Sequence, residues 1–283
     1  MNKQALIDKI HKISTTKEIT FNECWKQLIL DRFLSRLARS EQSKKFIFKG
    51  GFLLSYMIEL GRETKDLDFL LTKINASESE IIDAVKEIAQ EPLDDGFSYK
   101  YNSIEILNQP HMNYPGYRIN LDVQFSNMKN RIQIDVGVGD VVTPIRYELE
   151  TFEHKGQKLF ENDVSLFVYP PETIYAEKLE TILSKGSFNS RMKDYHDLFL
   201  LSRNPQLFQK NTFQKSIKVT FDNRNTMFKL INFTENELLQ LQSLWNYHLK
   251  DIDIKAKDLN IPKNIHEVIK DINMFLIQME ISE

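Results

Sequence analysis

The chain has 283 residues, of which 41 % are hydrophobic and 27 % charged, and its formal net charge is -3. This composition is ordinary for a globular protein and excludes a disordered or collagen-like chain, and the length allows one large domain or two modest ones. The near balance of charge means that any nucleic-acid-binding surface must be local. The single cysteine, Cys24, excludes a disulfide framework and a cysteine-cluster zinc site. We find no apolar run of the roughly 18 residues that a membrane span needs and no signal-peptide core, so we expect a cytoplasmic protein without membrane contacts.

The first half of the chain alternates between helical and extended patterns. Helical spacing predicts helices within residues 1–45 and again over 52–60, with the short apolar run 46–48 between them. Residues 67–71 predict a strand, and Ser77 with Glu80 forms the pattern of a capping box that begins a helix.

Three extended stretches follow, over residues 97–107, 117–125 and 132–138. The last two alternate between apolar and polar residues, as half-buried strands do. The short break at 126–130 predicts that they form a hairpin.

The pattern becomes helical after about residue 165. Pro171 is well placed to begin a helix over 172–185, and a second helix is expected over 191–202. Thr234 and Glu237 form another capping-box pattern, and apolar spacing over 265–279 predicts a C-terminal helix. We therefore predict an α+β protein. Residues 1–165 would form a domain with a mixed sheet flanked by helices, and residues 166–283 a mostly helical domain.

Two aspartates mark the predicted strand over 67–71. Residues two apart in a strand face the same side, so Asp66 and Asp68 project together while Leu67 and Phe69 face the core. Paired carboxylates suit Mg²⁺, which takes oxygen ligands from one or two carboxylates and leaves the rest to water and phosphate. A solvated strand edge would explain the same pair.

A glycine pair precedes these acids. Gly50 and Gly51 follow Lys49 between a predicted strand and a predicted helix, where backbone N–H groups can approach a phosphate. A tight turn that needs positive φ is the alternative explanation. The spacing matches neither a P-loop nor a dinucleotide fingerprint.

A third acid, Asp135, points away from the apolar face of the extended stretch 132–138. Three carboxylates on adjacent strands can hold two metal ions and support an in-line phosphoryl displacement. By itself, Asp135 fits the polar face of a half-buried strand equally well.

Lys178 lies within the apolar stripe of the predicted helix 172–185, where an unpaired ammonium group is costly. A triphosphate would be a natural counter-charge, although lysine side chains often extend past apolar neighbours to water. Asp194 and Asp197 share one face of the next helix. They could anchor Lys178 or Arg191, act as a base, or form ordinary surface pairs.

The segment from Arg203 to Leu230 is locally basic, with six basic residues against one acid and four phenylalanines between them. Such a mixture suits an RNA backbone with stacked bases, and it equally suits an ordinary amphipathic helix. The candidate RNA-binding residues are Lys210, Lys215, Lys218 and Arg224.

Taken in order, these motifs resemble the AbiEii/AbiGii toxin family of nucleotidyltransferases. The resemblance spans about residues 46–200 and rests on Lys49-Gly50-Gly51, Arg62-x-Thr64-x-Asp66-x-Asp68, Ile134-Asp135-Val136, Ala176-Glu177-Lys178-Leu179 and Arg191-x-Lys193-Asp194-x-x-Asp197-Leu198. It implies a DNA-polymerase-β-like nucleotidyltransferase fold. It also implies the toxin half of a type IV toxin–antitoxin pair, with a cognate antitoxin and a link to abortive phage infection.

The resemblance also implies roles for individual residues. Asp66, Asp68 and Asp135 would bind metal, Lys178 would contact the nucleotide phosphates, and Asp194 would be the downstream catalytic acid, with Asp197 fitting that role as well. Gly50 and Gly51 would hold the phosphate tail. The wider superfamily usually has a serine after the first glycine, and this chain has Gly51, so phosphate contact falls to backbone N–H groups and to Lys49, Arg62 or Thr64.

The expected reaction is transfer of a nucleoside monophosphate from an NTP to an acceptor hydroxyl, with two Mg²⁺ ions and release of pyrophosphate. Some relatives modify the acceptor end of tRNA, so tRNA is the expected acceptor. Two alternatives stay open, namely a nucleotidyltransferase for small molecules such as aminoglycosides and a catalytically silent binding module.

Overall fold

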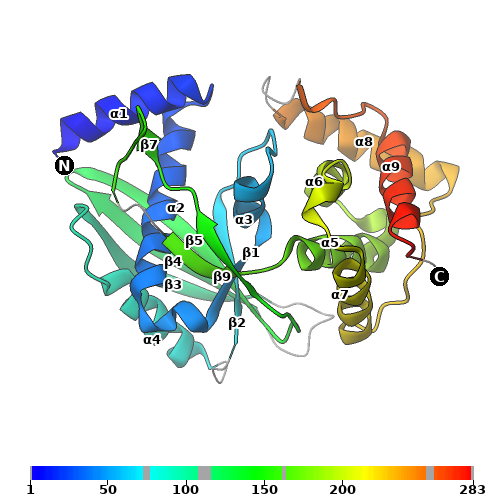
Figure 1. Ribbon diagram of the computed structural model, residues 1–283, viewed down its shortest axis with the longest axis horizontal. Coiled ribbons are helices and arrows are strands. Elements are labelled where there is room, and N and C mark those ends of the chain that lie inside the picture. Colours follow the sequence, from blue (N-terminus) through cyan, green and yellow to red (C-terminus); the bar gives the residue numbers. More distant parts are fainter. Residues whose placement is uncertain (1, 73–76, 108–115, 161–163, 253–257, 282–283) are drawn as a thin grey trace. The chain divides into compact units, whose positions relative to one another are not determined.

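The computed structural model describes residues 2–72, 77–107, 116–160, 164–252 and 258–281. The chain forms two compact units (Figure 1). The N-terminal unit comprises Met1–Tyr56, Glu63–Gly139 and Pro144–Tyr169, and the C-terminal unit comprises Met57–Arg62, Asp140–Thr143 and Pro170–Glu283. The division between the long parts of the two units falls at residues 169–170, close to the predicted boundary after residue 165. The two short segments of the C-terminal unit lie in the sequence between elements of the N-terminal unit, so no local pattern assigns them.

The N-terminal unit combines four α-helices and one 3₁₀ turn with all the strands of the described residues. The helical elements are α1 (Lys3–Thr16), α2 (Phe21–Arg39), η1 (Glu41–Lys44), α3 (Gly50–Met57, whose last residue is in the C-terminal unit) and α4 (Glu78–Gln90). The strands are β1 (Phe46–Lys49), β2 (Asp66–Leu71), β3 (Phe97–Leu107), β4 (Gly116–Phe125), β5 (Met128–Val138), β6 (Ile145–Leu149), β7 (Glu153–His154), β8 (Gln157–Lys158) and β9 (Val164–Val168).

Seven of the described strands form one mixed sheet in the order β3-β4-β5-β2-β1-β9-β6, while β7 and β8 form a separate hairpin. β2 pairs with β5 in parallel, as β1 does with β9, and the other neighbours are antiparallel. The predicted α+β class, with a mixed sheet flanked by helices, is confirmed. The predicted hairpin is β4–β5.

The hairpin turn is tighter than predicted. Only Ser126 and Asn127 separate the two strands, and Ser126 adopts a φ of 54° that a two-residue turn requires. β5 therefore begins at Met128, because its polar first residues pair with β4 although they show no apolar alternation.

The helices α2 and α4 pack against each other and against strands of the sheet (Figure 1). The alternating side chains of β4 and β5 face this layer, and Ile119, Leu121 and Ile134 are fully buried. At the start of α4 the predicted capping box is wrong in one respect. The Ser77 hydroxyl donates to the Glu80 carboxylate and caps no backbone N–H group.

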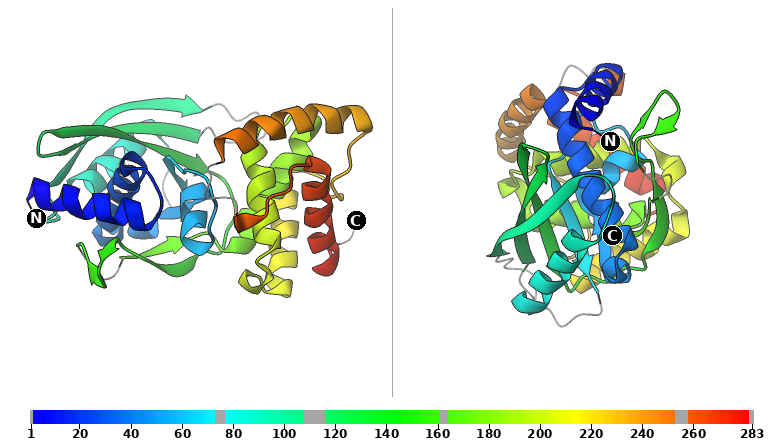
Figure 2. Two further views of the ribbon diagram at one scale, coloured as in Figure 1. Left: turned by 90° about the horizontal axis from the view of Figure 1, so that it is seen from above. Right: turned by 90° about the vertical axis from the view of Figure 1, so that its left-hand side faces the viewer.

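The C-terminal unit is helical. Its elements are α5 (Pro171–Lys185), η2 (Gly186–Phe188), α6 (Met192–Ser202), η3 (Pro205–Leu207), α7 (Lys210–Asn223), α8 (Glu235–Asp251) and α9 (Ile265–Gln278). The capping box predicted from Thr234 and Glu237 is present at the start of α8. Figures 1 and 2 show α9, in red, beside α6, in yellow.

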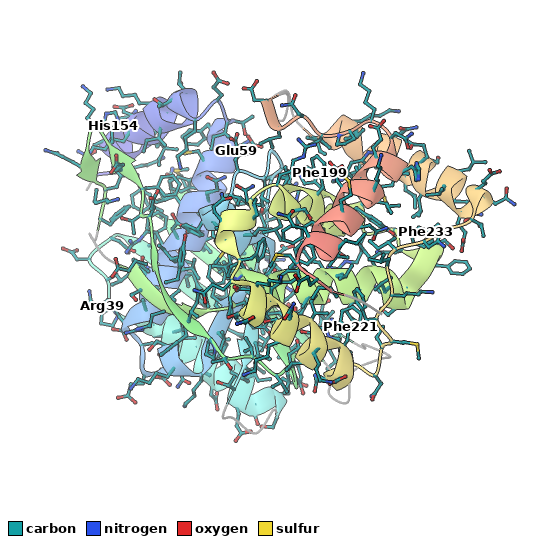
Figure 3. The ribbon with its side chains drawn as sticks, turned by 45° about the vertical axis from the view of Figure 1, so that its right-hand side comes forward. Arg39, Glu59, His154, Phe199, Phe221 and Phe233 are labelled. Atoms are coloured by element: carbon teal, nitrogen blue, oxygen red, sulfur yellow. The ribbon has the colours of Figure 1, made fainter. Side chains whose placement is uncertain are left out.

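The core of this unit contains a cluster of aromatic rings in which Tyr175, Phe213 and Phe275 lie within 5.5 Å of one another, centroid to centroid. Phe199 and Phe221, labelled in Figure 3, are also buried in the unit. In the described residues, no helix is both long and apolar enough to cross a membrane.

Candidate active site

The strands β2 and β5 place two of the predicted acids next to each other. They run parallel, and in their register Asp68 is the direct partner of Asp135 while Asp66 is the partner of Gln133. Leu67 is completely buried between the two half-buried aspartates of β2. The sheet therefore presents Asp66 and Asp68 on one face, as their spacing predicts.

Gly50 brings the glycine turn against one of these acids. Its φ is 79°, a conformation that side chains other than glycine rarely adopt. A Cβ atom at this position would lie 2.0 Å from Oδ2 of Asp68. Only glycine therefore lets the start of α3 approach the Asp68 carboxylate, whereas Gly51 does not adopt positive φ.

Lys49 lies in the same corner of the unit, because it is the register partner of Asp68 across the antiparallel pair β1–β2. Its ammonium group lies 4.7 Å from the centre of the Tyr169 ring and donates to the Tyr169 hydroxyl at 3.3 Å. Thr64, two residues before Asp66, has a buried hydroxyl without a hydrogen-bond partner among the described residues. An unsatisfied buried hydroxyl of this kind is available to a ligand.

Asp135 is bonded to an arginine that lies in none of the sequence motifs. Arg118 on β4 is its register partner, and Nε and Nη2 of Arg118 donate to the two carboxylate oxygens at 2.9 and 2.8 Å. The hydrogen bond to Asp135 and the nearby negative charges, Asp66 among them, raise the pKa of Arg118. The predicted hairpin contained the signal for this pair, since a two-residue turn fixes which side chains face each other, but the turn was predicted too long.

The three aspartates supply the hard oxygen ligands that Mg²⁺ prefers, and the Asp68 carboxylate fills the space where a Cβ atom of Gly50 would lie, close to the start of α3. The donor set therefore fits a magnesium site. Within the described ranges, however, no three histidine, cysteine, aspartate or glutamate side chains are grouped as a site that could hold a metal ion. Metal binding by Asp66, Asp68 and Asp135 stays a prediction.

The C-terminal unit holds the other predicted residues in a buried network of charges. Lys178 Nζ donates to Asp194 Oδ1 at 3.1 Å and lies 2.7 Å from Asp197 Oδ2. Arg62 donates two hydrogen bonds to the same Asp197, from Nε to Oδ1 at 2.9 Å and from Nη2 to Oδ2 at 2.7 Å. Both carboxylates are at most 3 % exposed, and Arg191 lies 3.1 Å from Asp194 at the surface end.

The pKa shifts in this network follow from burial and from opposite charges. Burial alone would lower the pKa of Lys178, but the charges of Asp197 and Asp194 outweigh it and the pKa is raised. Burial would likewise raise the pKa of Asp197, but Lys178 and Arg62 hold it well below its usual value. Lys178 is therefore a charged ammonium group with two carboxylate partners, in agreement with the interpretation that these acids anchor it.

The two acids beside Lys178 differ in their surroundings. Asp197 is fully buried, and both of its oxygens are bonded to Arg62. Asp194 Oδ2 accepts no hydrogen bond within the described part of the chain, but it lies 3.1 Å from Arg191 Nε in an ion pair. Which of the two acids would be the downstream catalytic acid stays a prediction.

The basic segment is largely part of an ordinary helical layer. Phe213 and Phe221 are buried in α7 and cannot stack on bases. Arg224 is turned inward, where it pairs with Glu180 at 2.9 Å, with Asp140 at 3.1 Å and with Glu177 at 3.3 Å.

The other candidate RNA-binding residues are exposed on α7. Lys210 pairs with Glu280 and Lys218 with Asp222, while Lys215 forms no ion pair among the described residues. Lys210, Lys215 and Lys218 are thus the residues of this group that can still contact a nucleic acid.

A family model described as nucleotidyl transferase AbiEii toxin, type IV TA system, matches residues 32–272, which is most of the chain. The protein therefore belongs to this family of nucleotidyltransferase toxins. The resemblance noted from the motifs is confirmed. A comparison with curated proteins gives no match.

Solved structures similar to the chain include two from Helicobacter pylori. A candidate nucleotidyltransferase has 15 % identity and a TM-score of 0.47, and the match covers 99 % of this chain and 96 % of that one. The protein JHP933 has 13 % identity and a TM-score of 0.46, with 92 % of each chain covered.

Proposed function

We propose that the protein transfers a nucleoside monophosphate from an NTP to an acceptor hydroxyl and releases pyrophosphate. The observation that carries this proposal is the register of Asp68 with Asp135 on neighbouring parallel strands, beside the glycine turn that starts α3. Carboxylates at this position next to a helix N-terminus combine a site for a divalent ion with a site for phosphate.

Asp66, Asp68 and Asp135 are the residues that would hold Mg²⁺. When bound there, the ion supplies charge neutralisation at the phosphates and a lower pKa for the acceptor hydroxyl. The chain's own groups position the nucleotide. Backbone N–H groups at Gly50 and Gly51 and the unsatisfied hydroxyl of Thr64 are suited to phosphate oxygens.

In the proposed transfer, the acceptor oxygen forms a bond to the α-phosphorus, and the bond from that phosphorus to the bridging oxygen of the β-phosphate breaks. Pyrophosphate carries away the electron pair, and the acceptor proton passes to the Asp135 carboxylate. Catalysis of this kind depends mainly on positioning and on electrostatic stabilisation. Lys178 is proposed to contact the nucleotide phosphates and Asp194 to be the downstream catalytic acid, while Lys49 and Arg62 are proposed to support nucleotide binding.

The biological role that we propose is that of the toxin in a type IV toxin–antitoxin pair, with a cognate antitoxin and a part in abortive phage infection. Membership of the family supports this role. The proposed acceptor is tRNA, and the exposed lysines of α7 support an acceptor with a phosphate backbone. We place the protein in the cytoplasm, where tRNA and NTPs are available.

The test of the reaction is incubation of the purified protein with Mg²⁺, each α-labelled NTP and, in separate samples, tRNA, total RNA and aminoglycosides. We expect label in tRNA. Label in an aminoglycoside alone would support the small-molecule alternative, and no transfer to any acceptor would support a silent binding module.

Asp66→Ala and Asp68→Ala should each lower transfer by at least about 100-fold without unfolding the protein, since each removes a preorganised charge. The matched control is Asp122→Ala. Asp122 is an aspartate of the same sheet that is 47 % exposed and pairs with Arg131. Transfer at the wild-type rate by either of the first two variants would contradict the proposal.

The acceptor is tested separately by the double variant Lys215→Glu and Lys218→Glu. We expect weaker tRNA modification and a shallower dependence on salt concentration, because fewer phosphate contacts release fewer counterions. Lys129→Glu, at an exposed lysine on β5, is the control. An unchanged salt dependence in the double variant would exclude α7 as an RNA-binding surface.

A further inference from the structure

We propose that Arg118 is a positioning residue that competes with the divalent ion for Asp135. The inference rests on the proposed function and goes beyond it, because it gives the third acid two alternative partners. Asp135 would be bonded to Arg118 before the ion binds, and it would exchange the guanidinium for the ion when the site fills.

The first observation is the completeness of the pair. Arg118 and Asp135 are direct neighbours across β4 and β5, and their two parallel hydrogen bonds measure 2.9 and 2.8 Å. Both carboxylate oxygens of Asp135 are thus in use. Gln133, the register partner of Asp66, supports the arrangement, since its amide oxygen, with the side-chain amide turned over, accepts from Arg118 Nε at 3.0 Å and from Nη2 at 3.2 Å.

The second observation is the charge that Arg118 meets. It lies close enough to interact electrostatically with Asp66 and Glu105 as well as with Asp135. Carboxylates that share one side of a sheet repel one another, and a cation between them stabilises the ionised forms. Arg118 therefore performs for these acids the electrostatic task that a divalent ion performs in a loaded site.

The third observation is that the pair can open. The side chains of Arg118 and Asp135 are 34 % and 22 % exposed, so the guanidinium can turn to water without leaving a buried charge unpaired. This separates the pair from the fully buried Arg36–Asp95 pair of the same unit, whose side chains are at most 3 % exposed. Exchange of partners therefore costs more free energy in the buried Arg36–Asp95 pair than in the Arg118–Asp135 pair.

The same hairpin offers a matched control. Arg131 and Asp122 are also register partners on β4 and β5 and form a 2.9 Å ion pair, but their side chains are 58 % and 47 % exposed. In this second pair the arginine and the aspartate have exchanged strands. It therefore tests the effect of removing an arginine from this hairpin without removing the partner of Asp135.

The experiment measures binding of Mn²⁺ alone by electron paramagnetic resonance, with full-length protein and no nucleotide. Arg118→Gln should bind Mn²⁺ roughly three- to tenfold more tightly than the wild type, because a competing cation is lost from a partly exposed site. Arg131→Gln should bind as the wild type does. An unchanged or weaker affinity in Arg118→Gln would overturn the inference.

Asp135→Asn provides the second arm. In the wild-type background it should weaken Mn²⁺ binding, because the ion loses the ligand it acquires on exchange. Combined with Asp135→Asn, Arg118→Gln should no longer give a gain in affinity, since the released carboxylate is what the ion acquires. A gain that persists in the double variant would show that Arg118 acts through another group and would refute competition for Asp135.

Two further variants separate this inference from the proposed function. Asp66→Asn and Asp68→Asn should weaken Mn²⁺ binding in every background. If they have no effect, the ion site itself is absent and both proposals fail, whereas if they weaken binding and Arg118→Gln changes nothing, only the competition is refuted. If Arg118→Gln does not fold, Arg118→Lys serves in its place. It keeps the charge but not both hydrogen bonds, and its Mn²⁺ affinity should lie between those of the wild type and a variant without the charge.

Discussion

Gly50 and Asp68 lie in a contact that no residue other than glycine could make at position 50. Gly50 has a φ of 79°, and a Cβ atom there would overlap the Asp68 side chain, 2.0 Å from Oδ2 and 2.6 Å from Cγ. The aspartate predicted to bind metal and the glycine predicted to admit phosphate are thus in direct contact. The contact explains why the residue that follows β1 and begins α3 must be glycine.

Gly50→Ala should lower the free energy of unfolding by about 3 kcal/mol, because alanine is strained at this φ and its methyl group would displace the Asp68 carboxylate. Gly156→Ala is the matched control. Gly156 has a φ of 73°, and no described atom lies within 4 Å of the position of its Cβ. The free energy of unfolding of Gly156→Ala should fall by only about 1 kcal/mol, the part that comes from backbone strain. Equal losses, measured by urea unfolding, would show that the contact with Asp68 contributes nothing.

Lys178→Met should destabilise the protein by about 3–5 kcal/mol, since it leaves Asp194 and Asp197 buried with fewer cationic partners. The control is Lys218→Met. Lys218 pairs with Asp222, but the two side chains are 77 % and 67 % exposed, so its loss should change stability by less than about 1 kcal/mol. Thermal unfolding of both variants measures the difference, and similar effects would mean that the buried network does not stabilise the unit.

Asp31 gives the N-terminal unit a predictable dependence on pH. Burial raises the pKa of this carboxyl to about 7, although the hydrogen bond donated by Tyr56 acts in the opposite direction. The folded chain therefore keeps a proton that the unfolded chain loses near pH 4. Stability from this group is fully present below the unfolded pKa, and it is lost as the pH rises through about 7.

Asp31→Asn should remove this dependence, because the amide cannot ionise. Between about pH 4 and about pH 8 the free energy of unfolding of the wild type should fall relative to that of the variant by on the order of 4 kcal/mol. Urea unfolding across that range measures it, with Asp122→Asn as the exposed control. A constant difference would mean that Asp31 is ionised in the folded protein throughout.

Arg224→Gln tests whether this residue supports structure or RNA binding. Its guanidinium is surrounded by Asp140, Glu177 and Glu180, and these acids raise its pKa, outweighing the effect of burial. The variant should lose about 3 kcal/mol or more of stability, since three buried or half-buried carboxylates would lose the guanidinium that they share. The salt dependence of tRNA binding should stay unchanged at temperatures where the variant is folded, and a reduced salt slope would assign Arg224 to the RNA surface after all.

Local patterns in the sequence were sufficient for most elements of the fold. The alternation around Asp135 predicted a strand with the acid on its polar face, and the Thr234 capping box began a helix where expected. Such signals lie within a few neighbouring residues, so no tertiary contact is needed to see them. The predictions of the hairpin turn and of the Ser77 cap were wrong because local sequence allows two geometries at each place. Strand pairing decided the length of the turn, and the Glu80 carboxylate decided the partner of the Ser77 hydroxyl.

By itself, the sequence determined the family, the α+β class and the identity of the candidate acids, because spacing along one strand or helix fixes which residues share a face. Only the tertiary structure decided the partners of those residues. These partners come from separate elements: Arg118 pairs with Asp135, Asp197 pairs with Arg62 and Lys178, and Gly50 contacts Asp68. The length of the hairpin turn fixes the register of Arg118 with Asp135. For the other contacts the register depends on how strands and helices pack, and distance along the chain carries no information about it.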